Sequence, residues 1–242
     1  TTITMRIKFS FSKNTSNVII NNQSLVNSYI HKCLGKNNIY HDAKNDYNIS
    51  QLYGGKLNAD NKTISFNEGG YIVVSSLNTE FINKLICGIL MNPKFINGMV
   101  FSGTEFIQEH FYNGWNHFAT LTPFIIKTYP NREKYKFLKS TDENFEEKLK
   151  EKNKYIFLKF TDDNFNEKLK QYLKRKLSAI DKTLDLSNFD VKVPIHNDHK
   201  TKDVLIKNVI NTGNLCHISI YTNKKVAELL YNIGIGQSTG SG

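Results

Sequence analysis

The sequence is poor in cysteine and has no long hydrophobic run. Its three cysteines, Cys33, Cys87 and Cys216, lie far apart and form no C-x-x-C pair, so neither a zinc cluster nor a disulfide framework is indicated. This usage favours a reducing, cytoplasmic location. The longest apolar stretch, residues 85–91, is far shorter than the roughly 20 residues that a membrane-spanning helix needs. We therefore expect no membrane contact, no metal and no cofactor.

Positive charge exceeds negative charge, because 32 Lys and Arg face 22 Asp and Glu, for a formal net charge of +10. The excess is spread over both halves of the chain and points toward an acidic partner such as nucleic acid. The heavy use of Asn, Lys and Ile, typical of an AT-rich genome, is an alternative source of part of that charge. With 39% hydrophobic residues the chain can bury a core, which excludes the disordered, collagen-like and fibrous classes.

The spacing of apolar residues predicts one order of elements in each half. We start at Met5, since residues 1–4 read as a short non-native start. In the first half, strands are predicted at 5–11, 49–57, 62–67, 71–76, 99–110 and 116–122, and helices at 22–34 and 78–91. In the second half, strands are predicted at 124–129 and 189–195, a hairpin at 204–211 and 215–221 turning over 211–214, and helices at 162–177 and 223–233.

This order is the ferredoxin-like βαββαβ plan. The predicted fold class is therefore α+β, with two tandem ferredoxin-like domains at residues 5–122 and 123–242. The second domain is expected to lack its last strand in this sequence. It also contains an internal repeat, because residues 134–150 match residues 154–170 at thirteen of seventeen positions. We interpret the repeat as a local duplication inserted into the second domain, with a solvated charged hairpin without function as the alternative.

Four glycines, Gly234, Gly236, Gly240 and Gly242, follow the last predicted helix. Glycines let backbone N–H groups approach a phosphate closely. The segment is not a Walker loop, since no Gly-Lys-Ser/Thr follows, and it is not a dinucleotide fingerprint, which needs a preceding strand. A helix cap followed by a flexible tail is the alternative.

Residues 231–242 (YNIGIGQSTGSG) resemble the glycine-rich loop of the repeat-associated RNA-binding (RAMP) superfamily of CRISPR proteins, and specifically of the endoribonucleases that cut precursor CRISPR RNA. Gly234, Gly236 and Gly242 match the pattern, although its closing Gly-Phe-Gly is cut short here. Residues 5–9, 88–93 and 118–123 agree with that family in order and spacing. The resemblance implies two ferredoxin-like domains and metal-independent cleavage of repeat RNA to 2′,3′-cyclic phosphate and 5′-hydroxyl ends. A non-catalytic RNA-binding subunit of the same superfamily is the alternative.

The resemblance also implies where the catalytic residues lie. His41 matches the position of the family's principal histidine, and His31 stands about where some members carry a catalytic tyrosine. Lys44 could neutralise the scissile phosphate. Histidine suits proton transfer near neutral pH, so the residue types agree with the implied reaction. A surface-loop role for His41 and a helix-surface or capping role for His31 stay open.

RNA contacts are expected from the four glycines and from further residues of both domains, namely Lys192, Lys207, Lys224, Lys225 and Tyr47. A solvated face for the lysines and simple packing for the tyrosine are the alternatives. His196 and His199, with Asp198 between them, lack an evident third ligand, and we interpret them as surface residues. The expected partner is CRISPR repeat RNA, and a homodimer or a CRISPR effector complex stays open.

Overall fold

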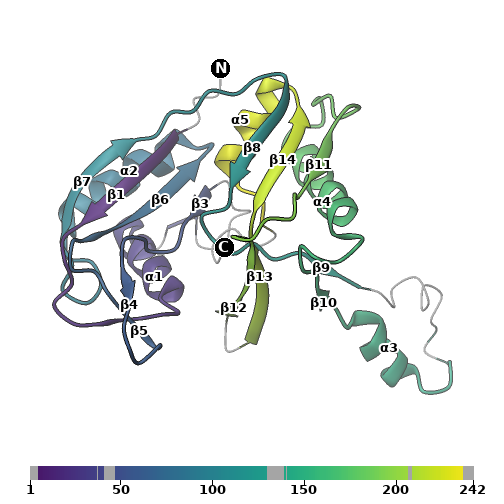
Figure 1. Cartoon of the computed structure of the whole chain (residues 1–242), viewed down its shortest axis with the longest axis horizontal. Coiled ribbons are helices and arrows are strands. Elements are labelled where there is room, and N and C mark those ends of the chain that lie inside the picture. Colours follow the sequence, from purple (N-terminus) through teal and green to yellow (C-terminus); the bar gives the residue numbers. More distant parts are fainter. Residues whose placement is uncertain are drawn as a thin grey trace.

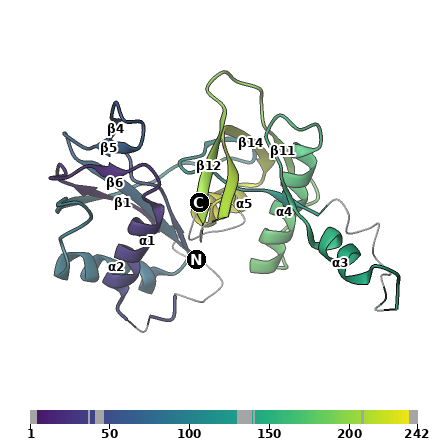
Figure 2. The same ribbon diagram turned by 90° about the horizontal axis from the view of Figure 1, so that it is seen from below.

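The computed structural model describes residues 5–36, 38–40, 47–129, 139, 141–206 and 209–236. Two separate hydrophobic cores are present, one formed by residues between Ile7 and Met99 and the other by residues between Phe124 and Ile233. Each core lies between a sheet and the helices that cover one of its faces. Figure 1 shows the two sheets side by side, and Figure 2 shows α1 and α2 together on one side of the N-terminal sheet.

The N-terminal unit is a four-stranded antiparallel sheet covered by two helices. Its elements are β1 (Met5–Phe11), α1 (Gln23–Leu34), β3 (Tyr47–Ile49), β6 (Gly70–Ser76), α2 (Thr79–Met91) and β7 (Phe101–Phe106), and a small side sheet holds β2 (Val18–Ile19), β4 (Lys56–Leu57) and β5 (Thr63–Ser65). The strand order β3-β6-β1-β7 confirms the ferredoxin-like plan predicted for this half. Alternation along β1 buries Ile7 and Phe9 and leaves Arg6 and Lys8 on the open face.

The second unit has a three-stranded sheet in the order β11-β14-β8. Its elements are β8 (Gly114–Ala119), β9 (Lys127–Thr128), α3 (Phe145–Asn153), β10 (Ile156–Phe157), α4 (Phe165–Ile180), β11 (Asp190–Lys192), β12 (Lys200–Ile206), β13 (Val209–Leu215), β14 (His217–Thr222) and α5 (Lys224–Ile233). This order is the ferredoxin-like one without a fourth strand among the described residues. Within those residues, no helix is long and apolar enough to cross a membrane.

Two strand assignments in this half differ from the sequence prediction. Residues 114–119 are expected in the N-terminal domain, but they form β8, which pairs with β14 as the first strand of the second sheet. The strand expected at 124–129 shrinks to β9, which pairs with β10 alone. Alternation shows that a strand has two faces, but it does not show which sheet the strand joins. The pairing partner of β8 lies about a hundred residues further along the chain.

The turn predicted at 211–214 is wrong, because these residues lie inside β13, which pairs with β12. Asn214 is fully buried, where its side chain donates to the carbonyl of Leu158 at 2.9 Å and accepts from the N–H of Phe160 at 2.9 Å. A Cβ on Gly213 would lie 2.7 Å from Pro123. This Gly-Asn pair therefore serves close packing in the interior of the second unit.

The two repeat copies make the same local contacts. In the first copy the N–H of Lys139 donates to the carboxylate of Asp142 at 2.9 Å, and in the second the N–H of Lys159 donates to Asp162 at 2.8 Å. The second copy continues into α4, where Phe165 begins the buried face of that helix. The repeated sequence therefore gives the same helix start twice, as its Thr-Asp signal predicts.

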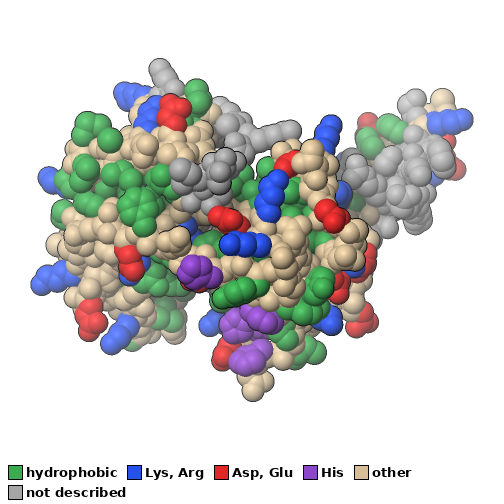
Figure 3. All heavy atoms as spheres, turned by 90° about the horizontal axis from the view of Figure 1, so that it is seen from above, with side chains coloured by type: hydrophobic (Ala, Val, Ile, Leu, Met, Phe, Trp, Pro, Cys, Tyr) green, Lys and Arg blue, Asp and Glu red, His purple; other side chains and the backbone are tan. Residues whose placement is uncertain are grey.

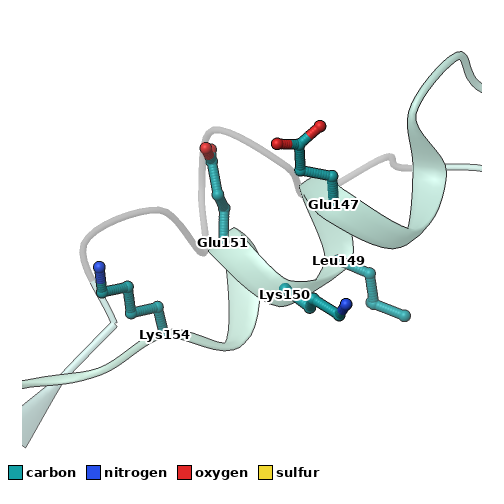
Figure 4. Close-up of a pocket in the computed structure, with 5 residues that line it drawn as sticks. All are labelled: Glu147, Leu149, Lys150, Glu151 and Lys154. Atoms are coloured by element: carbon teal, nitrogen blue, oxygen red, sulfur yellow. The ribbon is translucent and has the colours of Figure 1, made fainter.

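The copies differ in packing. Leu169 of the second copy is fully buried, whereas its counterpart Leu149 in the first copy is 37% exposed. Figure 1 shows α3 projecting away from the second sheet. About 580 Å³ of space lies beside α3, and Figure 4 shows its side chains pointing in different directions, with Glu147 and Glu151 on one side and Lys150 on another. No group of polar atoms converges there among the described residues.

Helices α1 and α2 approach closely at Gly88. A Cβ at this position would collide with the backbone carbonyl of Cys33. We therefore expect Gly88→Ala to lower the free energy of unfolding by about 1–3 kcal/mol, measured by urea denaturation. In an exposed helix the same change would stabilise the protein by about 1 kcal/mol. A decrease in the free energy of unfolding would therefore indicate that the two helices are in close contact at Gly88. Gly103→Ala is the matched control, because a Cβ there meets nothing within 4 Å, and equal effects of the two changes would contradict the contact.

Candidate functional site

The C-terminal end of α5 joins the two units. The guanidinium of Arg6 in β1 donates from Nη1 to the carbonyl of Tyr231 at 2.9 Å and lies 4.1 Å from the centre of its ring. The hydroxyl of Ser75 in β6 donates to the carbonyl of Asn232 at 2.7 Å. Both donors come from the open face of the N-terminal sheet and both acceptors from the last turn of α5. A cavity of about 570 Å³ lies beside this junction and is lined by residues of both units, among them Arg6, Ser75, Glu109, Phe111, Tyr231 and Gly236.

The glycine-rich segment leaves α5 through a left-handed residue. Gly234 caps the helix with φ +68°, and a Cβ there would collide with the side chain of Asn48 in β3. Both the dihedral angle and the close approach require glycine at this position. The described part of the glycine-rich segment, residues 234–236, therefore packs on the edge strand of the N-terminal sheet.

Two α4 side chains hold the same segment from the other side. The Lys176 ammonium donates to the carbonyls of Ile233, Gly234 and Gly236 at 3.0, 2.8 and 3.2 Å, and the Tyr172 hydroxyl donates to the carbonyl of Gly236 at 2.7 Å. Burial lowers the pKa of Lys176 to about 8 and raises that of Tyr172 to about 12. The sequence analysis missed both residues. The sequence pattern that could have indicated them is their position next to Leu173 and Leu177, which form the buried face of α4.

His31 lies on α1 and is half-buried. Its ring is 6.5 Å from the ring of Tyr47, the first residue of β3, and the two planes meet at 73°. Asn48, the next residue, contacts the glycine-rich segment. Adjacent strand residues point to opposite faces, so His31 and Gly234 approach β3 from its two sides. The structure thus brings two predicted site residues to one short strand.

Tyr47 itself belongs to the N-terminal core. It is 3% exposed, stacks on Phe81 with ring centres 4.6 Å apart, and its hydroxyl donates to the carbonyl of Tyr40 at 3.3 Å. No face of this ring is open to a base, which contradicts the predicted RNA contact. Alternation in a three-residue strand is too short to show which face is buried.

Five predicted site residues lie outside the described residues: His41, Lys44, Lys207, Gly240 and Gly242. Along the chain, His41 and Lys44 stand directly before β3. Gly240 and Gly242 follow the segment that Lys176 and Tyr172 hold.

Lys224 and Lys225 begin α5, as predicted. The side chain of Asn223 caps this helix by accepting from the N–H of Val226 at 3.0 Å. The Lys225 ammonium pairs with the carboxylate of Asp181 at 3.1 Å, and the Lys225 side chain is 72% exposed. Two lysines at the positive end of a helix are unfavourable, and Asp181 offsets part of that charge. A phosphate is therefore not required to explain them.

Lys192 belongs to an aromatic surface that the sequence analysis did not assemble. Its ammonium lies 4.9 Å from the ring centre of Trp115, and Trp115 packs edge-on against Tyr221 with ring centres 5.5 Å apart. Both rings are exposed, at 39% and 40%. The three residues come from β11, β8 and β14 and share the open face of the second sheet, which we call the aromatic face. Exposed rings beside a cation suit stacking with unpaired bases.

Three histidines meet at one edge of this sheet. The rings of His196, His199 and His217 lie 5.2–5.7 Å apart, and Figure 3 shows histidine side chains gathered on the second unit. The ring Nε2 of His199 accepts from the N–H of His217 at 2.9 Å, and burial lowers its pKa. In the part of the chain that is described, no group of three His, Cys, Asp or Glu residues could hold a metal ion.

Comparisons with known proteins agree with this architecture. Residues 149–242 match the family model "CRISPR associated protein Cas6, C-terminal", while no curated protein matches the chain. A solved structure of a Cas6-related protein from Pyrococcus furiosus is similar at a TM-score of 0.77 and 18% identity, covering 99% of this chain and 96% of that chain. A RAMP protein that binds different RNA substrates has a TM-score of 0.75 at 18% identity, with 98% and 96% covered.

A third structure, that of a CRISPR associated protein Cas6, has a TM-score of 0.73 at 18% identity, with 99% of this chain and 97% of that chain covered. At such identities the structural likeness concerns the fold, whereas the family model concerns the sequence of the second unit. The two findings agree over residues 149–242. The family match therefore covers the second unit, and the whole chain shares the fold of these CRISPR-associated structures.

Proposed function

We propose that this protein binds CRISPR repeat RNA and cuts it by internal attack of a ribose 2′-hydroxyl, without a metal ion, as a step in guide RNA maturation. The family match supports a role in processing or binding CRISPR RNA. The observation that carries the proposal is that α1 and the glycine-rich segment both contact the short strand β3, from its two sides: His31 packs near Tyr47 and Gly234 contacts Asn48. His31 and Gly234 are both among the site residues that the sequence analysis expects.

The reaction requires two proton transfers and one charge stabiliser. The 2′-hydroxyl gives its proton to a base as its oxygen attacks phosphorus, and the 5′-oxygen receives a proton from an acid as the P–O5′ bond breaks. We assign these transfers to His41 and His31, and we assign stabilisation of the extra negative charge to Lys44. The products are a 2′,3′-cyclic phosphate and a 5′-hydroxyl.

RNA binding draws on both units. We assign phosphate contacts to the backbone of the glycine-rich segment and to the lysines of the second unit, Lys192, Lys207, Lys224 and Lys225. The aromatic face would take unpaired bases. A cytoplasmic location agrees with the free thiols of all three cysteines. A homodimer or a place in an effector complex stays a prediction.

A second candidate function is RNA binding without cleavage. The aromatic face favours it, because Trp115, Tyr221 and Lys192 can hold RNA but supply no proton transfer. Both candidate functions require binding of the same RNA, but only the first includes its cleavage. Experiments that measure cleavage and affinity separately therefore distinguish them.

The first prediction concerns the nucleophile and the metal. We expect the protein to cut a transcript of its genome's own CRISPR repeat in EDTA, leaving 2′,3′-cyclic phosphate ends detectable by end mapping. A single 2′-deoxy substitution just upstream of the cut should abolish cleavage and leave the affinity within about tenfold, because it removes the attacking oxygen. Cleavage that needs magnesium, or that continues on the deoxy substrate, would contradict the proposed reaction.

The second prediction concerns the histidines. A general acid or base contributes about 10²- to 10⁴-fold, so His41→Ala and His31→Ala should each slow single-turnover cleavage by that order. RNA affinity should change by less than about tenfold. The double variant should lose less than the product of the two effects, since acid and base act as one unit. His196→Ala is the control and should cut at the normal rate, because His196 is an exposed histidine outside the proposed site.

The mutation results also test the alternative. If rate and affinity fall together in His41→Ala, that residue binds RNA rather than transferring a proton. If neither single variant slows cleavage, the assignment of the acid and base is wrong.

The third prediction uses the only tryptophan of the chain. Because Trp115 lies on the aromatic face, stacking of an RNA base should quench its fluorescence in a saturable manner, and duplex RNA should not. Tyr221→Ala should weaken single-stranded RNA binding about tenfold, which is the order of one stacked base. Tyr129→Ala is the matched control, since Tyr129 is also 40% exposed but lies next to β9. Tight RNA binding without quenching would place the bases elsewhere.

A further inference from the structure

The contact between α4 and the glycine-rich segment is complete in its hydrogen bonding. An ammonium group has three N–H donors, and Lys176 uses them on three carbonyls, those of Ile233, Gly234 and Gly236. The carbonyl of Gly236 also accepts from the hydroxyl of Tyr172. Lys176 and Tyr172 are four residues apart and therefore neighbours on one face of α4.

The carbonyls that Lys176 meets need a partner. The last four carbonyls of a helix have no acceptor role within it, and the helix dipole makes this end negative. Ile233 ends α5 and Gly234 caps it, so an ammonium at this point satisfies two terminal carbonyls at once. The bond to Gly236 extends the same contact two residues into the glycine-rich segment. One cation therefore contacts both ends of residues 234–236, and the Tyr172 hydroxyl adds a second bond to Gly236.

We propose that Lys176, assisted by Tyr172, is a positioning residue that fixes the backbone of the glycine-rich segment in the geometry that binds RNA. The inference rests on the proposed RNA-binding function, and it names a residue with no contact of its own to RNA. Lys176 acts through residues 234–236, whose N–H groups and glycines face the ligand in the proposal.

The protonation state of Lys176 sets the number of anchored carbonyls. Burial lowers its pKa to about 8, and a neutral amine has two N–H donors for three carbonyls. Deprotonation therefore leaves one of the three carbonyls without an N–H donor from Lys176. Nζ contacts the three carbonyls of α5 and the segment, the Tyr172 hydroxyl shares the Gly236 carbonyl with it, and Arg175 on α4 acts on Tyr172. Tyr172 stays protonated through this range, because its pKa is raised to about 12.

Global stability moves in the opposite direction. The pKa of Lys176 is about 8 in the folded protein and near 10.4 in the unfolded chain, so the unfolded state binds more protons between these values. The contribution of this group to the free energy of unfolding therefore rises as the pH rises through that window. A purely structural role would give higher stability and unchanged RNA affinity. The positioning role gives higher stability and weaker RNA binding.

The test measures RNA affinity against pH with four variants of the full chain. The probe is a fluorescein-labelled transcript of one CRISPR repeat of the source genome, followed by anisotropy between about pH 7 and pH 9.5. The variants are Lys176→Arg, which keeps a charge that does not titrate, Lys176→Met, which keeps the stem without donors, Tyr172→Phe, and Lys174→Met. Lys174→Met is the matched control, because two residues correspond to about 200° around a helix.

We expect the wild type to lose about threefold to tenfold in affinity with a midpoint near pH 8, which is the order of one hydrogen bond. Lys176→Arg should show no such step, Lys176→Met should bind weakly at every pH, and Tyr172→Phe should weaken binding while keeping the step. Lys174→Met should follow the wild type. Thermal unfolding of each variant, recorded over the same pH range, separates loss of fold from loss of positioning.

Three results would overturn the inference: a flat wild-type profile, a step that persists in Lys176→Arg, or normal affinity in Lys176→Met. A persisting step would belong to another titrating group, such as Lys202, whose pKa burial also lowers. If Lys176→Met does not fold, the pH profile of Lys176→Arg and the RNA affinity of Tyr172→Phe still test the positioning role. If the wild type binds the repeat RNA at no pH, the proposed function fails, and the positioning role fails with it for that distinct reason.

Discussion

The end of α5 is the constraint on which the arrangement of the molecule depends. A helix leaves its last four carbonyls without partners inside the helix, and buried carbonyls without partners are costly. Here the four carbonyls from Tyr231 to Gly234 each accept from a side chain of another element. Arg6 and Ser75 donate from the N-terminal sheet, and Lys176 donates from α4. One helix end therefore fixes the N-terminal sheet, the second unit and the glycine-rich segment relative to one another.

This constraint explains how a site can be built from residues far apart in sequence. α1 supplies His31, and the glycine-rich segment begins about two hundred residues later. Both contact β3, from its two sides, because α1 covers one face of the sheet to which β3 belongs and α5 docks its last turn on the open face. The docking is polar at its centre, with the Arg6 guanidinium and the Ser75 hydroxyl as donors. Such contacts are directional, so they define the exit of the chain from α5 more sharply than apolar packing would.

The sequence predicted what depends on local pattern. The alternation of residues 5–11, the helix after Asn78 and the helix after Asn223 all appear where expected, because caps and periodicity act over a few residues.

The sequence-based prediction failed where the structure of a segment depends on a distant partner. β8 has the alternation of any half-buried strand, and its place in the second sheet depends on β14. Trp115, Lys192 and Tyr221 likewise become one surface only through the pairing of β8, β11 and β14. Tyr47 reads as a loop tyrosine until Phe81 is seen to cover it, and nothing in the sequence singles out Lys176 until the end of α5 is placed beside it.

The internal repeat shows, within one molecule, the same difference between features that depend on local sequence and features that depend on distant contacts. Its two copies share thirteen of seventeen residues and make the same bond from a lysine N–H to an aspartate at the helix start. That bond depends on residues three apart, so both copies form it. The burial of Leu169 and the exposure of Leu149 depend on what lies next to each copy, and the sequence of the copy contains no information about that.

The second copy leads into the helix that carries Tyr172 and Lys176, and its buried Phe165 and Leu169 hold α4 against the second sheet. None of the described residues of the first copy belongs to this core. The second copy therefore fixes the position of α4, and with it the position at which Tyr172 and Lys176 contact the glycine-rich segment.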